Sequence, residues 1–240
     1  MSGHSKWATI KRAKGAADLK RGLTFTKISN AITVAVKAGG GIADPNSNFK
    51  LRLAIEAARA ANMPKDNIER ATQKALGKGA GEMSEVTYEG FAPEGICVII
   101  EAATDNTLRT TSEIKSIFNK EGGSFGQPGS VAYQFVQKGR IVIDKNGKTM
   151  DELFEIAVES GAEDIEDVQN KAIITTTYSD LSSVRERLLA KGITPEEVEA
   201  IRKPLNPITI SDPEKLQKIV HFLDKLESLD DVQKVYSNLA

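Results

Sequence analysis

Lysine and arginine side chains are concentrated near the start of the chain, at a density that suits neutralisation of phosphate groups. Residues 3–27 read GHSKWATIKRAKGAADLKRGLTFTK and hold seven cations against one acid, Asp18. Few large apolar side chains accompany them, so the segment has little to bury in a core. Cations interleaved with an aromatic residue are typical of segments that neutralise a nucleic-acid backbone and stack on its bases. The alternative is a solvated basic arm without a partner.

We therefore predict a nucleic-acid-binding surface that begins in this segment and continues into the residues behind it. Cations would contact phosphates along the track, and the aromatic ring would stack on a base or ribose. The predicted binding residues are Lys6, Trp7, Lys11, Arg12, Lys14, Lys20, Arg21, Lys27, Arg52 and Arg59. Phosphate contacts carry no base sequence, so the pattern does not separate DNA from messenger or ribosomal RNA.

The charge of the whole chain conceals this concentration, because the net charge of the 240 residues is only -1. Residues 1–78 contain fifteen Lys and Arg against five Asp and Glu, whereas residues 79–240 contain seventeen against twenty-eight. A basic third followed by an acidic remainder indicates that one part binds a polyanion. The acidic residues between 152 and 167 offer a surface for a protein partner, with a solvated face as the simpler alternative.

Candidates for catalysis or metal binding are few. The chain has two histidines, His4 and His221, and one cysteine, Cys97, which alternates with large apolar residues as in a buried strand. These residues indicate neither a nucleophile–base pair nor a metal site. The polar cluster at 104–106 follows a predicted strand, where its simplest role is to cap the next helix. We expect no enzyme activity, no metal and no cofactor.

The sequence also bears on the compartment. No apolar run approaches the length of a transmembrane helix, about 20 residues, and the basic start lacks the apolar block of a secretory signal. A single cysteine excludes an intramolecular disulfide framework and favours a reducing environment. We expect a cytoplasmic monomer that does not contact membranes.

Apolar periodicity predicts three helices in the basic third of the chain. The first ends at the glycines 39–41. The second is expected to open at Asp44 and Pro45, and the third at a capping box formed by Asp66 and Glu69. Together these helices would form a small bundle with a basic surface.

Beyond residues 77–84, which are rich in glycine and mark a domain boundary, strands and helices alternate. Strands are predicted at 86–91, 96–102, 131–136, 140–144, 165–168, 172–177, 198–203, 207–210 and 232–236. Helices are predicted at 108–120, 150–160, 181–190 and 213–226. The order within 140–203 is the split βαβ unit of ferredoxin-like folds, and the segments on either side of it would complete a second such unit.

The expected fold class is therefore α+β, with an N-terminal three-helix basic domain followed by two ferredoxin-like α/β domains, one inserted in the other. The expected domains are residues 1–80 for the basic arm and bundle, 81–137 plus 205–240 for a discontinuous ferredoxin-like domain, and 138–204 for the inserted acidic domain.

Several motifs of the chain resemble those of the YebC/PmpR family, and the resemblance covers essentially the whole length. They are GHSKW and ATIKRAK near the start, FTKI after the RG pair at 21–22, DPNSN, LRLAIEAARAANMPKDNIERA, YEGFAPEGICVIIEAATDN, GSV at 129–131, GAED at 161–164 and DDVQKVYSN. The chain departs from the usual pattern at Leu23, Phe49–Lys50, Ala92 and Leu108. The first of these departures removes a cation.

The resemblance implies a three-domain protein with a helical N-terminal domain and two α/β domains. It further implies a non-enzymatic regulator of gene expression, either a DNA-binding transcriptional regulator or a ribosome-associated translation factor. Mitochondrial members of the family are described as translational activators of a cytochrome oxidase subunit.

Overall fold

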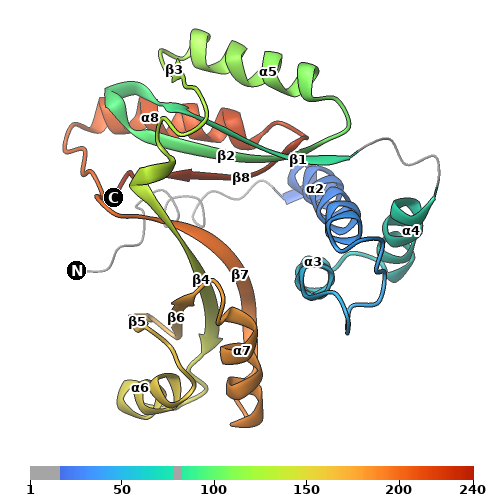
Figure 1. The fold of residues 1–240 in the computed structure, drawn as a ribbon. Coiled ribbons are helices and arrows are strands. Elements are labelled where there is room, and N and C mark those ends of the chain that lie inside the picture. Colours follow the sequence, from blue (N-terminus) through green and yellow to red (C-terminus); the bar gives the residue numbers. More distant parts are fainter. Residues whose placement is uncertain (1–16, 78–82) are drawn as a thin grey trace. The chain divides into compact units, whose positions relative to one another are not determined.

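The chain folds into an N-terminal group of helices followed by two four-stranded sheets (Figure 1). The computed structural model describes residues 17–77 and 83–240, and side chains from residue 22 on. These residues divide into two compact units. The first unit comprises the chain up to Phe135 together with Pro204–Ala240, and the second comprises Val136–Lys203. The predicted α+β class is confirmed, and the finer division into three domains stays a prediction.

Three helices open the described chain and share one apolar core. They are α2 (Ala17–Ala38), α3 (Phe49–Ala60) and α4 (Lys65–Leu76). Both α3 and α4 pack against α2. The core contains Ile32 and Val36, which lie one turn apart on the buried face of α2, together with Leu51 of α3 and Ile68 of α4.

The start of α3 differs from the prediction. We expected the helix to open at Asp44 and Pro45, but it begins at Phe49. The buried Asn48 side chain caps it, accepting a hydrogen bond from the Leu51 amide at 3.0 Å. The Asp44 carboxylate instead accepts hydrogen bonds within the preceding turn, which lower its pKa.

The predicted capping box of α4 is also wrong. This helix begins at Lys65, one residue before Asp66, and its N-cap is Pro64, which makes no side-chain capping bond. Glu69 therefore has no capping role, and its carboxylate lies 3.3 Å from the Lys65 ammonium. Because the helix starts earlier than expected, Asp66 falls in its first turn, where a carboxylate interacts favourably with the helix dipole.

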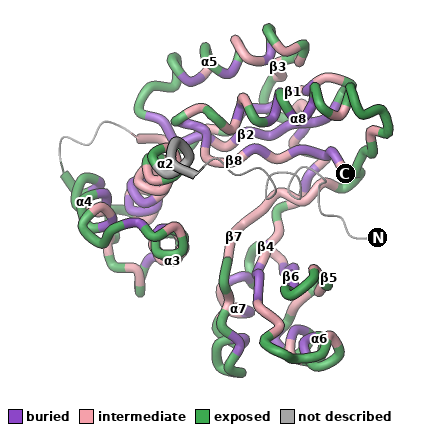
Figure 2. Tube along the Cα trace, turned by 180° about the vertical axis from the view of Figure 1, so that it is seen from behind, coloured by how far each residue is buried: buried purple, intermediate pink, exposed green. Residues whose placement is uncertain are grey.

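The first unit contains a sheet of order β3-β1-β2-β8. Its strands are β1 (Ser84–Phe91), β2 (Cys97–Thr104), β3 (Ser124–Phe125) and β8 (Val232–Ser237). A 3-10 turn, η1 (Pro93–Gly95), joins β1 to β2. Side chains of α5 (Thr107–Lys120) and α8 (Pro213–Glu227) share its main core, in which the Phe118 and Phe222 rings meet edge to face at 5.0 Å. Figure 2 shows buried residues along β2 and β8.

The third strand of this sheet lies outside its predicted range. We expected a strand at 131–136, but residues Ala132–Gln134 form a 3-10 helix, η2, and the strand is β3 in the glycine-rich connection before it. The reason is Glu89, whose buried carboxylate accepts hydrogen bonds from the amides of Gly129, Val131 and Ala132 at 2.7, 2.8 and 2.8 Å. Amides bound to a side chain cannot donate to a strand ladder.

Gly90 allows β3 to pair with β1 at the edge of the sheet. A Cβ atom at this position would lie 2.5 Å from the Phe118 ring and 2.6 Å from the Ser124 carbonyl oxygen. Glycine therefore permits the close approach of the strand and the helix.

The strand predicted at 207–210 is reduced to one isolated parallel bridge between Ile208 and Leu239. The Ile208 amide donates to the Asn238 carbonyl at 2.7 Å, and the Ala240 amide donates to the Ile208 carbonyl at 2.9 Å. Pro207 has no amide hydrogen, which limits a ladder at this position.

The second unit contains a sheet of order β5-β6-β4-β7, which is the ferredoxin-like arrangement. Its strands are β4 (Phe135–Asp144), β5 (Asp164–Val168), β6 (Lys171–Thr177) and β7 (Pro195–Pro204). Its helices are α6 (Met150–Glu159) and α7 (Leu181–Ala190). Thr149 and Glu152 form a capping box at the start of α6. The predicted order of strands and helices in this segment is confirmed.

Candidate nucleic-acid interface

The structure describes only part of the predicted binding track. Lys6, Trp7, Lys11, Arg12 and Lys14 lie outside the described residues. Lys20 and Arg21 belong to α2, at positions where side chains are not described. Lys27, Arg52 and Arg59 are described with their side chains, and the structure places them on two helices of the first unit.

Lys27 contacts the end of another helix. Its ammonium donates a hydrogen bond of 2.5 Å to the carbonyl oxygen of Glu227, the last residue of α8. A cation is stabilised there because the carbonyl groups at a helix C-terminus carry partial negative charge. Lys27 therefore joins α2 to the α/β part of the first unit, an intramolecular role that the sequence did not indicate.

Arg52 and Arg59 lie on α3 in different settings. The Arg52 guanidinium donates hydrogen bonds to the carbonyl oxygens of Pro45 and Asn46 at 3.0 and 3.1 Å, and lies 5.8 Å from the centre of the Phe49 ring. It therefore holds the turn that precedes α3. Arg59 is exposed in the last turn of α3.

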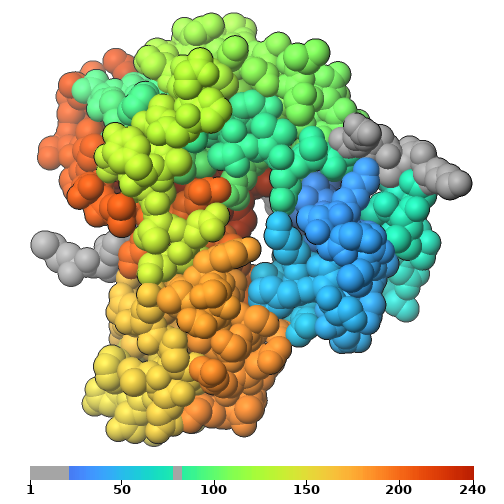
Figure 3. Space-filling model, in the orientation of Figure 1, coloured from blue at the N-terminus to red at the C-terminus, as the bar shows by residue number. Residues whose placement is uncertain are grey.

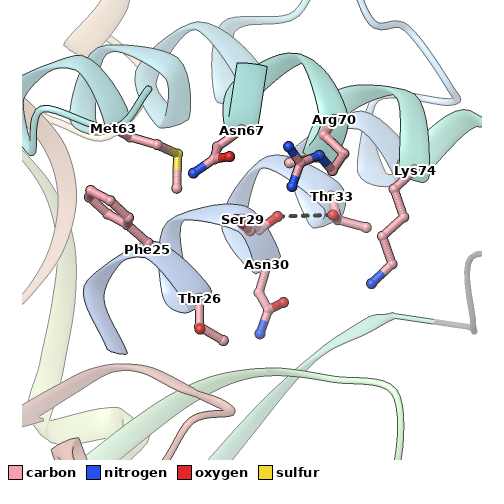
Figure 4. A pocket seen from close by; sticks show the side chains of 10 residues that line it. Phe25, Thr26, Ser29, Asn30, Thr33, Met63, Asn67, Arg70 and Lys74 are labelled. Atoms are coloured by element: carbon pink, nitrogen blue, oxygen red, sulfur yellow. Dashed lines mark hydrogen bonds between the residues drawn. The ribbon is translucent and has the colours of Figure 1, made fainter. Parts of the chain in front are cut away.

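A polar groove of about 350 Å³ runs between α2 and α4. Figure 4 shows its lining, with Asn67 and Arg70 pointing from α4 toward α2. Its lining residues are Phe25, Thr26, Ser29, Asn30, Thr33, Met63, Asn67, Arg70, Ala71 and Lys74. Two cations and no carboxylate belong to this set, so the groove attracts anions.

A second hollow of about 570 Å³ shares Thr26, Asn30 and Lys74 with the first. Its remaining lining includes the carboxylates of four residues, Asp105, Glu113, Asp230 and Asp231, together with Arg109. Four acids against two cations make this hollow net negative. A polyanion on the first unit therefore finds a favourable surface in the α2–α4 groove and an unfavourable one beside it.

The sequence analysis did not single out the groove residues. A pattern that could have identified part of the groove is present on α4. Asn67, Arg70 and Lys74 follow one another at spacings of three and four, so they share one face of the helix. Their meeting with Phe25 and Asn30 of α2 could not be read from sequence, because it depends on how two helices pack.

The other polar candidates have structural roles. Asn106 is the N-cap of α5 and accepts a hydrogen bond from the Arg109 amide at 3.0 Å, which confirms the capping interpretation. Cys97 is buried, and burial raises the pKa of its thiol, which opposes the thiolate form. His221 is exposed, with its Nε2 3.7 Å from the Glu121 carboxylate. No cluster of metal-ligating side chains occurs within 17–77 and 83–240, and no helix of that part is long and apolar enough to cross a bilayer.

The fold and the groove define a class of α+β proteins in which a basic helical bundle precedes two ferredoxin-like sheets. Two family models match the chain. The TACO1/YebC protein N-terminal domain matches residues 5–78, and the TACO1/YebC second and third domain matches residues 83–239. The chain belongs to the TACO1/YebC family, as the resemblance predicted.

Relatives and a solved structure agree with this assignment. A protein of Desulfitobacterium hafniense is 44% identical over 99% of this chain and 95% of its own length. A protein of Roseiflexus castenholzii is 46% identical over 100% of this chain and 95% of its own. Both are named probable transcriptional regulatory protein. The crystal structure of a conserved hypothetical protein from Aquifex aeolicus has a TM-score of 0.84 at 42% identity, and the match covers 93% of this chain and 91% of that one.

Proposed function

We propose that this protein is a non-enzymatic, nucleic-acid-binding regulator of gene expression that acts through its basic N-terminal part. The observation that carries the proposal is the concentration of positive charge in residues 1–78, a part of the chain that also forms an acid-free groove between α2 and α4. The names of the relatives, probable transcriptional regulatory proteins, support a regulatory role.

The mechanism we infer is electrostatic docking. Lys6, Lys11, Arg12 and Lys14 would neutralise phosphates with Lys20 and Arg21, and Trp7 would stack on a base or ribose. The acidic hollow next to the groove and the acidic second unit would repel the same polyanion. The protein would then present one defined surface to the nucleic acid.

Two ligands are compatible with this chemistry. Duplex DNA is favoured by the names of the relatives. Ribosomal RNA, with a role in translation, is favoured by the aromatic and amide side chains of the α2–α4 groove, which a paired duplex would leave unused. Competition between duplex DNA and structured ribosomal RNA across a salt series discriminates between them. The physiological ligand should still bind with the higher affinity at high salt.

Changing Lys6, Lys11, Arg12 and Lys14 together to alanine is expected to weaken nucleic-acid binding by at least about tenfold. It should also make the slope of log affinity against log salt shallower by about 3 to 4, because four phosphate contacts are lost. Fluorescence anisotropy with labelled oligonucleotides at several salt concentrations measures both quantities.

The matched control removes the same charge from the second unit by changing Lys145, Lys148, Lys171 and Lys191 to alanine. This control should bind almost as tightly as the unchanged protein. An equal loss of affinity in the two variants would mean that binding depends on the total charge of the protein. The proposed docking through residues 6–14 would then be wrong.

The second unit carries a separate surface that we propose as a docking site for a basic protein segment. Phe154 and Val158, one turn apart on α6, are 56% and 54% exposed. Asp151, Glu155 and Glu159 follow one another at a spacing of four along the same helix and so form an acidic row beside them, in which Glu159 is paired with Lys191. Figure 3 shows this part of the chain, in yellow, at the surface. Exposed apolar side chains among acids complement a partner segment that combines apolar and basic residues.

Phe154→Ser combined with Val158→Ser is expected to reduce binding of a lysine- and leucine-rich helical peptide by about fivefold or more, with little change in stability because both side chains are exposed. Isothermal titration calorimetry measures the affinity, and a glutamate- and leucine-rich peptide serves as the control for charge. Unchanged affinity in the double variant would contradict the proposed surface.

We also propose a cytoplasmic location for this protein. The single cysteine, Cys97, is a buried free thiol, which is typical of proteins in reducing compartments.

A further inference from the structure

The α2–α4 groove combines three kinds of side chain in a fixed order. Phe25 and Met63 form an apolar end, Asn67 lies next to them, and Arg70 and Lys74 follow along α4 (Figure 4). A nucleotide has the same sequence of groups, because it joins a flat apolar ring with polar edges to a charged phosphate. The groove volume of about 350 Å³ lies within the range of small-ligand sites, roughly 300 to 1,000 Å³.

The polar side chains of the groove fall into two sets, because the Thr26 and Thr33 hydroxyl groups donate to backbone carbonyl oxygens of α2 and four other side chains do not bond within the described part of the chain. Among the residues that the structure describes, the side chains of Asn30, Asn67, Arg70 and Lys74 form no hydrogen bond or ion pair with one another or with a neighbour. Lys65, another cation of α4, is by contrast paired with Glu69 at 3.3 Å. Within the described residues, the donors and acceptors of these four side chains are therefore available to a ligand.

The apolar end is held in place by the helical core. Met63 is 6% exposed and belongs to the buried cluster of the three helices, and Phe25 packs against that cluster. The Phe25 side chain therefore packs against the helical core and at the same time lines the groove. A supported aromatic ring loses little conformational entropy when a base stacks on it.

We propose that the α2–α4 groove binds one unpaired nucleotide of a nucleic-acid strand. The base stacks on Phe25, Asn67 bonds to its exposed edge, and Arg70 and Lys74 contact the adjacent phosphates. A base within a duplex does not fit this arrangement, because its faces are stacked and its edge is paired. The inference rests on the proposed nucleic-acid function, and it names the form of the strand that the protein binds.

The test compares a single-stranded RNA, a single-stranded DNA of the same sequence and the corresponding duplex at matched salt. Phe25→Leu combined with Asn67→Ala should lower affinity for the single strands by about tenfold, the scale of one lost base stack and its edge contacts. The same variant should leave duplex affinity and the salt slope almost unchanged, since no phosphate contact is removed. Leucine at position 25 keeps an apolar side chain against the core, and a thermal melt checks that the variant is folded.

Gln73→Ala is the matched control, because Gln73 is an exposed amide of α4 outside the groove lining. It should bind all three ligands like the unchanged protein. The single variant Asn67→Ala tests the groove without touching the core. Single-strand affinity within about twofold of the unchanged protein in both groove variants would overturn the proposal, as would an equal loss for strand and duplex.

The two single strands separate RNA from DNA as the source of the nucleotide. The variant in which Lys6, Lys11, Arg12 and Lys14 are changed to alanine, called the arm variant, distinguishes a failure of this inference from a failure of the proposed function. If the arm variant loses affinity for every ligand while the groove variants lose none, the protein binds nucleic acid but the groove does not hold a nucleotide. If the arm variant loses nothing, the proposed function itself fails.

Discussion

Glu89→Ala is expected to lower the free energy of unfolding of the first unit by about 3 to 5 kcal/mol. Glu89 is buried on β1, and its carboxylate receives three backbone amides between residues 129 and 132. Hydrogen bonds to a charged acceptor contribute about 1.5 to 3 kcal/mol each. Alanine removes the acceptor and leaves the buried Val131 amide without a partner.

The experiment is urea denaturation of the full chain, followed by circular dichroism and by the exchange rates of the amides at 129–132. The amides of Gly129, Val131 and Ala132 should lose their protection in the variant, whereas the Ser130 amide keeps its bond to the Gln127 carbonyl. Glu85→Ala is the control, because Glu85 is an exposed carboxylate on the same strand whose ion pair with Lys50 is solvent-accessible on both sides. A loss below about 1 kcal/mol for Glu89→Ala, or a loss no larger than that of Glu85→Ala, would show that the carboxylate does not hold this loop.

Asp231→Ala is expected to cost about 3 kcal/mol of stability. The Asp231 Oδ2 atom lies 2.6 Å from Thr110 Oγ1, 2.8 Å from Arg109 Nη2 and 3.1 Å from Thr104 Oγ1. Both threonines are fully buried, so alanine leaves their hydroxyl groups with fewer partners in a dry site. Because Arg109 is partly exposed, the loss should lie at the lower end of the range for broken buried ion pairs, about 3 to 5 kcal/mol.

The same carboxylate predicts a pH dependence. Burial acts to raise the pKa of Asp231, but hydrogen bonds from Thr110, Arg109 and Thr104 outweigh it, so the pKa falls below its ordinary value of 3.8. A carboxyl group with a lowered pKa in the folded state stabilises the fold above its unfolded pKa, and the contribution is lost as the pH falls through the folded pKa. The stability contributed by Asp231 should therefore be constant near neutral pH and decline below about pH 4.

The measurement is the free energy of unfolding of the unchanged protein and of Asp231→Asn between pH 7 and pH 3. The difference between the two should shrink as the pH falls through that window. Asp230→Asn, which changes the exposed neighbouring carboxylate, controls for general charge effects. A difference that stays constant down to pH 3 would contradict the assignment of the lowered pKa to Asp231.

These two carboxylates also bear on the candidate interface. Asp231 and Arg109 line the acidic hollow beside the α2–α4 groove, whereas Glu89 shapes a loop on the sheet. We expect Glu89→Ala to affect nucleic-acid binding only through stability, whereas Asp231→Ala also removes one of the four acids of the hollow and so weakens its repulsion of the polyanion. Binding measured at temperatures where the variants remain folded should match that of the unchanged protein for Glu89→Ala and should be slightly tighter for Asp231→Ala.

The sequence by itself determined the existence of the helices, most strands and the charge distribution, but not where α3 and α4 begin. Apolar spacing is a local property, so it located α5, α6, α7 and α8 to within a residue or two of their observed ends. Asn106 was identified as a cap from its place before a helix, because capping depends on neighbours three residues away. The family motifs established the class of protein, and composition established its basic first third.

Tertiary structure decided the features that depend on residues far apart in the chain. Glu89 accepts hydrogen bonds from amides some 40 residues downstream, so the segment expected to be a strand forms the 3-10 helix η2. The edge strand of the sheet is β3 instead. Asn48 caps α3 while its amide group also donates to Ala35 of α2, so the packing of the two helices sets where α3 begins. The α2–α4 groove arises in the same way. Phe25 and Arg70 are 45 positions apart, and only the packing of α4 on α2 brings them to one site.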